Sequence, residues 1–243
     1  MGMMKRILLI SNSTLYGSGY LDHAESEIRG LLGPGRRIVF VPFAAYERGK
    51  YTAQARTRFE GMGCELISVH DVSNPCREVE TADAIFVGGG NTFRLLKGLY
   101  DFDLLEPLRR IAAEGKPYIG SSAGSIVAGP SLRTTKDMPV VEPPSFEALG
   151  LVPFQISPHY LDPDPSSRHM GETQEERILQ FLEENEAPVA GLREGAMLRV
   201  EGKTVTLKGS AGARLFRRGE QPVEVLPGAE VSSLLLQSSG SPA

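Results

Sequence analysis

Short apolar runs of strand length, separated by amphipathic or polar stretches, constrain the fold of this 243-residue chain more than any other feature. In the first half the runs lie at 6–11, 37–43, 64–69, 83–87 and 117–119, and we expect helices at 20–32, 51–62, 92–100 and 103–113. Strands and helices that alternate in this way predict a parallel sheet covered by helices on both faces. A hydrophobic fraction of 41% and a charged fraction of 23% agree with an ordinary globular protein.

The second half of the chain has a different pattern. After a Pro-rich stretch, strands are expected at 154–157, 189–192, 196–200, 204–207 and 213–216. Thr173 and Glu176 fit a capping box at the start of a helix that reaches about residue 184. The pair Glu201-Gly202 predicts a tight turn between two antiparallel strands. We therefore expect one α/β domain over 1–243, with a parallel core, C-terminal antiparallel hairpins and a flexible tail from about residue 232.

Charge and composition argue against several classes of partner. The net charge of −4 and the lack of a Lys/Arg run argue against a nucleic-acid partner. The longest apolar runs have strand length, so neither a transmembrane helix nor a membrane partner is expected, and the N-terminal residues do not resemble a signal peptide. Cys64 and Cys76 have no metal-like partners nearby, which favours a reducing, cytoplasmic location.

Polar or glycine-rich residues follow three of the expected strands. Asn12 follows the first strand, Gly88-Gly89-Gly90-Asn91 follows the fourth, and Ser122 follows the fifth. The carboxyl ends of parallel strands meet at one rim of a sheet, where ligands bind in folds of this type. We therefore expect these residues to lie together at a site.

The run Gly120-Ser121-Ser122-Ala123-Gly124 matches the pattern G-x-S-x-G after a strand. A sharp strand-to-helix turn with small neighbours exposes the central serine hydroxyl, which makes Ser122 the candidate nucleophile. Ser121 and Ser125 are alternatives, but neither occupies the central position. The amide of Ala123 would face an oxyanion, and the Gly88, Gly89 and Gly90 loop would supply the second donor. Glycine permits such a close approach of the backbone to a substrate.

A nucleophilic serine needs a base, and the chain has four histidines, at 23, 70, 159 and 169. His159 follows an expected strand and Pro158, so it can reach the same rim, and it is the best candidate. The base needs a carboxylate to orient it. Glu194, just after the strand at 189–192, and Asp137 are both candidates for that role.

At these residues the chain resembles the peptidase E family of α-aspartyl dipeptidases. The resemblance rests on LLISNSTLYGSGYLDH (8–23), FVGGGNTFRLLKGL (86–99), YIGSSAGSIVAG (118–129), RTTKDMPVVEPPSFEALGLVPFQISPH (133–159), GETQEERI (171–178) and AGLREGAML (190–198). It implies a three-layer, flavodoxin-like fold similar to the class I glutamine-amidotransferase domains. It also implies a Ser-His-Glu triad at Ser122, His159 and Glu194, which hydrolyses small peptides with an N-terminal aspartate and needs no metal or other cofactor.

One position departs from the family pattern. Relatives continue the GET segment with an arginine that binds the aspartate side chain of the substrate, whereas this chain has Gln174. An Arg–carboxylate pair is strong and geometrically selective, and glutamine has no charge to replace it. Arg168 and Arg177 are candidates to substitute for it. The rim residues Asn12, Asn91 and Asp137 are also expected to contact the substrate. A smaller departure is Ser121, where relatives often carry a bulkier residue.

Two other functions remain alternatives on the sequence. One is a cyanophycinase-like hydrolase of β-linked aspartyl substrates, or a serine hydrolase of small peptides with a different preference. The other is a ligand-binding relative that has lost the chemistry. A glutamine amidotransferase is disfavoured because Ser122 stands where that class needs cysteine. The sequence leaves the oligomeric state open, with a homodimer as one option.

Overall fold

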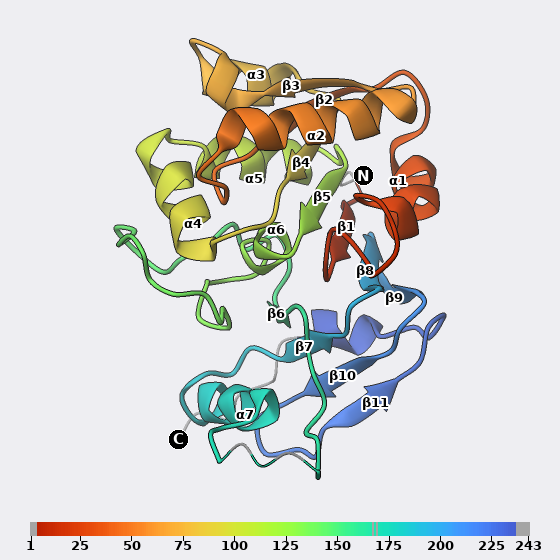
Figure 1. Cartoon of the computed structure of the whole chain (residues 1–243), viewed down its shortest axis with the longest axis vertical. Helices are drawn as coiled ribbons and strands as arrows, with labels where there is room; N and C mark the ends of the chain where they lie inside the picture. Colours follow the sequence, from red (N-terminus) through yellow and green to blue (C-terminus); the bar gives the residue numbers. More distant parts are fainter. Residues whose placement is uncertain (1–3, 167, 169, 237–243) are drawn as a thin grey trace.

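A seven-stranded sheet forms the larger layer of the computed structural model, which describes residues 4–166, 168 and 170–236 (Figure 1). The strand order is β3-β2-β4-β5-β1-β8-β9. These strands are β1 (Arg6–Ile10), β2 (Arg37–Val41), β3 (Glu65–Ser68), β4 (Ala84–Val87), β5 (Tyr118–Ser121), β8 (Ala196–Glu201) and β9 (Thr204–Gly209). The strands from β3 to β1 pair in parallel, whereas β8 is antiparallel to both β1 and β9. The expected parallel core and the hairpin at Gly202 are therefore confirmed.

Helices cover both faces of this sheet. They are α1 (Glu25–Leu32), α2 (Arg48–Gly61), α3 (Pro75–Thr81), α4 (Thr92–Asp101), α5 (Leu105–Ala113) and α6 (Ala123–Ile126), with the 3-10 turns η1 (Asp22–Ala24) and η2 (Val69–Asp71). In β1, Leu8 and Ile10 join one buried cluster, while Ile7 and Leu9 join another. Both faces of the strand are thus buried, which explains its continuous apolar run. Helix α3 was not expected from the sequence.

A second sheet contains the other C-terminal strands, in the order β11-β10-β7-β6. They are β6 (Gln155–Ser157), β7 (Val189–Leu192), β10 (Ala213–Phe216) and β11 (Val223–Val225), and helix α7 (Gln174–Glu184) lies beside them in Figure 1. Strands β6 and β7 are parallel, whereas β7, β10 and β11 are antiparallel. The capping box at Thr173 is present. One hydrophobic cluster includes Leu9 from the first sheet and Leu192 from the second, so the two sheets share a core.

The expected tail needs a correction. Ser232–Leu235 forms a 3-10 helix, η3, and Leu234 in it is fully buried. The hydroxyl of Ser232 also accepts a hydrogen bond from the amide of Val205. Burial of a leucine holds this segment against β9, so it belongs to the folded part. The rest of the predicted tail, 237–243, lies outside the described residues. In the part of the chain that the structure describes, no helix is both long and apolar enough to cross a membrane.

Helix α6 approaches β4 closely because Gly124 has no side chain. A methyl group on this residue would overlap the carbonyl oxygen of Val87, which is the last residue of β4. Backbone atoms in a sheet cannot move aside cheaply. Gly124 therefore fixes the distance between the turn at Ser122 and the end of β4.

We expect Gly124→Ala to lower the free energy of unfolding by about 1–3 kcal/mol, the usual cost of overpacking. Gly49→Ala is a matched control, because a methyl group there would meet no atom within 4 Å and the residue lies in α2. That control should stabilise the protein by about 0.5–1 kcal/mol. Urea unfolding of both variants measures the difference. Equal stability of Gly124→Ala and the unsubstituted protein would contradict this account of the packing.

Candidate active site

Ser122 lies in a strained turn between β5 and α6. Its φ of 51° and ψ of −110° are rare for a residue with a side chain. Its amide donates to the carbonyl of Ile10 at 2.9 Å, which ties the turn to the end of β1. Such a turn directs the hydroxyl away from the sheet and toward the rim. The local structure is therefore the strand–turn–helix that the G-x-S-x-G pattern predicts.

His159 and Glu194 complete a chain of hydrogen bonds that starts at Ser122. The Ser122 Oγ lies 3.0 Å from His159 Nε2, and His159 Nδ1 lies 2.8 Å from Glu194 Oε1. A carboxylate only accepts hydrogen bonds, so the proton of the neutral imidazole is on Nδ1. Nε2 is then free to accept the proton of the serine hydroxyl. This is the relative arrangement of a nucleophile, a base and an orienting acid.

The three side chains come from two sheets. Ser122 follows β5 of the large sheet, whereas His159 follows β6 and Glu194 follows β7 of the second sheet. The side chains of His159 and Glu194 are 40% and 51% exposed. The site is therefore open to solvent in this structure, and the charge of Glu194 is partly screened by water.

The alternatives from the sequence have other partners. Ser125 Oγ donates to the carbonyl of Ile10 at 2.8 Å, and Ser121 Oγ is buried without a hydrogen bond among the described residues. Asp137 Oδ2 accepts from the amide and the hydroxyl of Thr92, at 2.7 and 2.6 Å. Glu194, and not Asp137, therefore contacts the imidazole of His159.

Two of the remaining histidines, His23 and His70, do not contact Ser122. His70 Nδ1 lies 2.6 Å from Ser68 Oγ, at the amino end of η2. His23 has both ring nitrogens buried without a hydrogen bond in the described part of the chain. Burial lowers its pKa. His169 lies outside the described residues.

The end of β1 holds the parts of the site together. The hydroxyl of Ser11 accepts from the amide of His159 at 2.9 Å and donates to the carbonyl of Leu192 at 2.8 Å. The side chain of Asn12 accepts from the amide of Gly195 at 2.8 Å, next to Glu194. Ser11 and Asn12 are both buried. Because its amide group also donates to the carbonyl of Thr14, Asn12 holds a turn in place and does not face the cleft as a substrate-binding residue would.

Two of the three glycine amides predicted for the oxyanion hole already have acceptors. The amide of Gly88 donates to the carbonyl of Val41 at 3.1 Å, and that of Gly89 donates to the hydroxyl of Tyr51 at 2.8 Å. Within the described residues the amide of Gly90 has no acceptor. Ala123 is the first residue of α6, a position whose amide has no partner inside a helix. Of the amides predicted for the oxyanion hole, those of Gly90 and Ala123 therefore have no acceptor among the described residues and can bind an oxyanion.

A cleft of about 540 Å³ opens beside Ser122 and His159. Its lining includes Ser13, Thr14, Tyr20, Ala45, Tyr51, Gln54, Gly89, Gly90 and Asp137. Sequence alone does not identify Tyr51 as a residue of the cleft, since nothing in the expected helix distinguishes it from a surface tyrosine. Burial raises the pKa of its hydroxyl, so Tyr51 is neutral near pH 7. A small substrate could bind in this cleft next to the Ser122 hydroxyl.

The other residues expected to bind substrate divide into two groups. Asn91 caps α4: its side chain accepts from the amide of Arg94 and donates to the carbonyl of Met138. Arg168 is exposed on the loop before α7 and does not line the cleft. Gln174 and Arg177 lie together in a second, smaller pocket beside the site.

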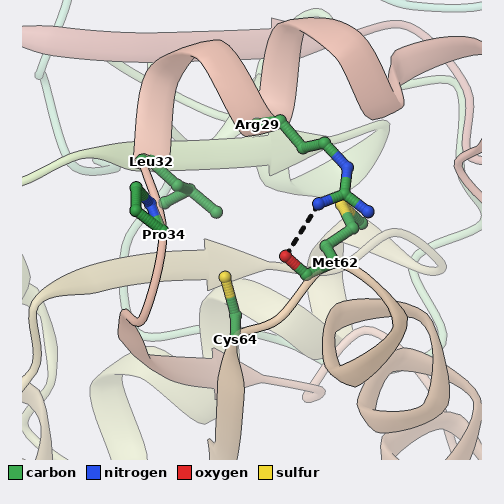
Figure 2. Close-up of a pocket in the computed structure, with 6 residues that line it drawn as sticks. Arg29, Leu32, Pro34, Met62 and Cys64 are labelled. Atoms are coloured by element: carbon green, nitrogen blue, oxygen red, sulfur yellow. Dashed lines mark hydrogen bonds between the residues drawn. The ribbon is translucent and has the colours of Figure 1, made fainter.

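Another pocket lies far from this chemistry. Figure 2 shows its lining by Arg29, Leu32, Pro34, Met62 and Cys64, with Arg29 donating to the carbonyl of Met62 at 2.9 Å. These residues precede β2 and β3, so the pocket is at the amino edge of the sheet. Ligands of such sheets bind at the opposite, carboxyl edge. The cleft at Ser122 is therefore the candidate site.

Comparison with known proteins agrees with this assignment of the fold. The model of peptidase family S51 matches residues 7–208. A Streptomyces coelicolor protein named peptidase E is 55% identical over 229 residues, which cover 94% of each chain. A Drosophila melanogaster protein named probable alpha-aspartyl dipeptidase is 45% identical and covers 97% of this chain and 99% of its own. The crystal structure of a peptidase from an acI-B1 actinobacterium has a TM-score of 0.72 at 17% identity, covering 95% of this chain and 98% of its own.

The geometry makes Ser122 the reactive serine among its neighbours. We expect a fluorophosphonate to modify Ser122 and to leave Ser121 and Ser125 unmodified, as mapped by peptide mass spectrometry. Because His159 Nε2 accepts the proton of the attacking hydroxyl, His159→Ala should slow the modification on the order of a hundredfold. Modification of Ser121 or Ser125, or an unchanged rate in His159→Ala, would contradict this reading of the site.

Proposed function

The chain belongs to peptidase family S51, and we propose that it is a serine peptidase that hydrolyses dipeptides and small peptides with an N-terminal aspartate. The relatives named peptidase E and probable alpha-aspartyl dipeptidase support this substrate class. The observation that carries the proposal is the continuous set of hydrogen bonds from Ser122 through His159 to Glu194, at 3.0 and 2.8 Å. The resemblance to the peptidase E family also predicts this triad.

In the proposed mechanism, Ser122 Oγ attacks the carbonyl carbon of the N-terminal residue while His159 Nε2 takes the hydroxyl proton. The amides of Gly90 and Ala123 stabilise the oxyanion. The imidazolium then gives its proton to the leaving amine, and an ester between Ser122 and the substrate remains. Water activated by His159 hydrolyses this ester and restores the serine. Glu194 keeps the proton of the neutral imidazole on Nδ1 and stabilises the imidazolium.

Asp137 is the residue that we propose to bind the N-terminal ammonium group of the substrate. Its side chain lines the cleft beside Ser122 and His159, and Oδ2 is held by the two hydrogen bonds from Thr92. A carboxylate fixed in this way offers its other oxygen to a cation. Recognition of a free amino group would restrict hydrolysis to the first peptide bond.

The proposal extends to location and assembly. A cytoplasmic location is supported by Cys64 and Cys76, which are both free thiols. A homodimer stays a prediction, and size-exclusion chromatography with light scattering measures the oligomeric state directly.

The substrate class is tested with the p-nitroanilides of aspartate, asparagine, glutamate and alanine. We expect kcat/KM to be highest for aspartate, and Ser122→Ala to lower kcat on the order of 10⁴-fold or more. Glu194→Gln should lower kcat by roughly 10²- to 10⁴-fold, because its amide does not stabilise the imidazolium. Near-normal turnover by Ser122→Ala would rule out the assigned nucleophile. Hydrolysis without any preference would retain the serine mechanism and reject the substrate class.

Asp137→Asn separates binding of the amino group from orientation of the base. We expect KM for aspartyl p-nitroanilide to rise about tenfold or more, because the ammonium group loses a charged acceptor. The effect on kcat should be much smaller than that of Glu194→Gln. N-acetyl-aspartyl p-nitroanilide serves as the control, since it carries no ammonium charge. An equal change in KM for the acetylated substrate would show that Asp137 does not recognise the amino group.

A further inference from the structure

A small pocket of about 80 Å³ lies next to the catalytic cleft. The loop that carries Asp137 into the cleft also carries Lys136 into this pocket. Ser157, at the end of β6 and two residues before His159, forms another part of its wall. The first turns of α7 supply Gln174. The pocket is therefore positioned to receive a group attached close to the scissile carbonyl.

The basic side chains that line this pocket are not balanced by acidic side chains in the same lining. Arg133, Lys136 and Arg177 are among the described residues that line it, and no Asp or Glu is among them. Lys136 Nζ donates to the carbonyls of Pro158 and His159, at 2.9 and 3.0 Å, and forms no ion pair in the described part of the chain.

The two arginines differ in how they are engaged. Arg133 lies over the ring of Phe146, with 5.3 Å from its guanidinium carbon to the ring centroid. Among the described residues, the ion-pair contact of Arg177 is a long one, of 3.6 Å, with Glu172 outside the pocket. Lys136 and Arg177 together leave a local positive potential that attracts an anion.

We propose that Lys136 determines the preference for aspartate in this chain: at this pocket it provides the main positive charge for the side-chain carboxylate of the substrate's N-terminal aspartate, with Arg177 as its second cation, in place of the arginine that the family pattern has at position 174. The inference rests on the proposed function. Gln174 can also donate a hydrogen bond to the carboxylate, without a charge. Its Oε1 accepts from the amide of Leu161, which leaves its NH2 group to donate. Lys136 and Asp137 would then bind the two charged groups of the same substrate residue, the carboxylate and the ammonium.

Lys136 also makes the preference sensitive to pH. Lys136 is exposed as a residue, but partial desolvation of its ammonium group lowers its pKa to about 8, with Arg177 acting in the same direction and Asp137 and Glu194 opposing it. The carbonyls of Pro158 and His159 accept hydrogen bonds from the same ammonium group. Below about pH 8 the ammonium form is present and binds a carboxylate, and above that pH the charge is lost from the free enzyme.

The ratio of kcat/KM for aspartyl over asparaginyl p-nitroanilide should therefore fall as pH rises through 8. The α-amino groups of both substrates titrate alike, so they cancel from this ratio to first order.

The test measures the same ratio in Lys136→Met, Lys136→Arg and, as a control, Lys203→Met. We expect Lys136→Met to lower the ratio about ten- to hundredfold, the size of a charged hydrogen bond. Lys136→Arg should keep the preference and remove its decline above pH 8, because arginine stays charged. Lys203 is exposed in the turn between β8 and β9, at the opposite edge of the sheet, and its variant should keep the ratio.

The possible failures are distinguishable. If Lys136→Met slows both substrates equally, Lys136 only supports the backbone at His159, and the inference is overturned. A wild-type enzyme that cleaves both substrates without preference overturns the carboxylate pocket and leaves the serine mechanism intact. No cleavage of either substrate by the wild-type enzyme rejects the proposed function, and the inference with it. Thermal unfolding of each variant identifies any loss that comes from misfolding.

Discussion

Hydrogen bonds at the carboxyl end of β1 are the interactions on which the site depends. The carbonyl of Ile10 accepts from the amide of Ser122, and the hydroxyl of Ser11 accepts from the amide of His159. Asn12 accepts from the amide of Gly195, next to Glu194. The last residue of β1 and the two residues after it thus position a nucleophile from the large sheet and two partners that follow strands of the second sheet. Buried polar groups are costly to leave unpaired, so these bonds favour one relative position of the two sheets.

Backbone strain is concentrated at the same place. Among the described residues, four that are not glycine have positive φ, and two of these are Ser122 and His159, at 51° and 52°. Such conformations cost of order 1–3 kcal/mol each and persist only where neighbouring bonds hold them. The Ile10 carbonyl and the Ser11 hydroxyl hold the two amides, and Lys136 holds the carbonyl of His159. The lysine that supports the backbone of the base in this way is also the cation assigned to the substrate carboxylate.

Much of the fold and of the triad could be predicted from sequence because the signals are local. Buried parallel strands appear as continuous apolar runs, and the strand–turn–helix around Ser122 needs small residues at fixed positions. The division of the C-terminal strands between two sheets could not be predicted, because no local sequence feature shows that β7 and β8 belong to different sheets. The same limit applies to Asn12, which looks like a ligand residue on the rim until its partner Gly195 is known. The roles of Lys136 and Tyr51 at the site depend on contacts with residues far away in the sequence, so local sequence patterns do not reveal them.

In the proposed mechanism, Ser122 forms a covalent ester with the N-terminal aspartyl residue of the substrate. The most direct measurement is a rapid acid quench during turnover of an activated aspartyl ester, for which the second step is expected to limit the rate, followed by digestion and mass spectrometry. The acyl-enzyme mechanism predicts an aspartyl group on the peptide that contains Ser122, formed within one turnover and lost as substrate is exhausted. An aspartyl group on a different residue, or continued turnover with every copy of the Ser122 peptide unmodified, would contradict it.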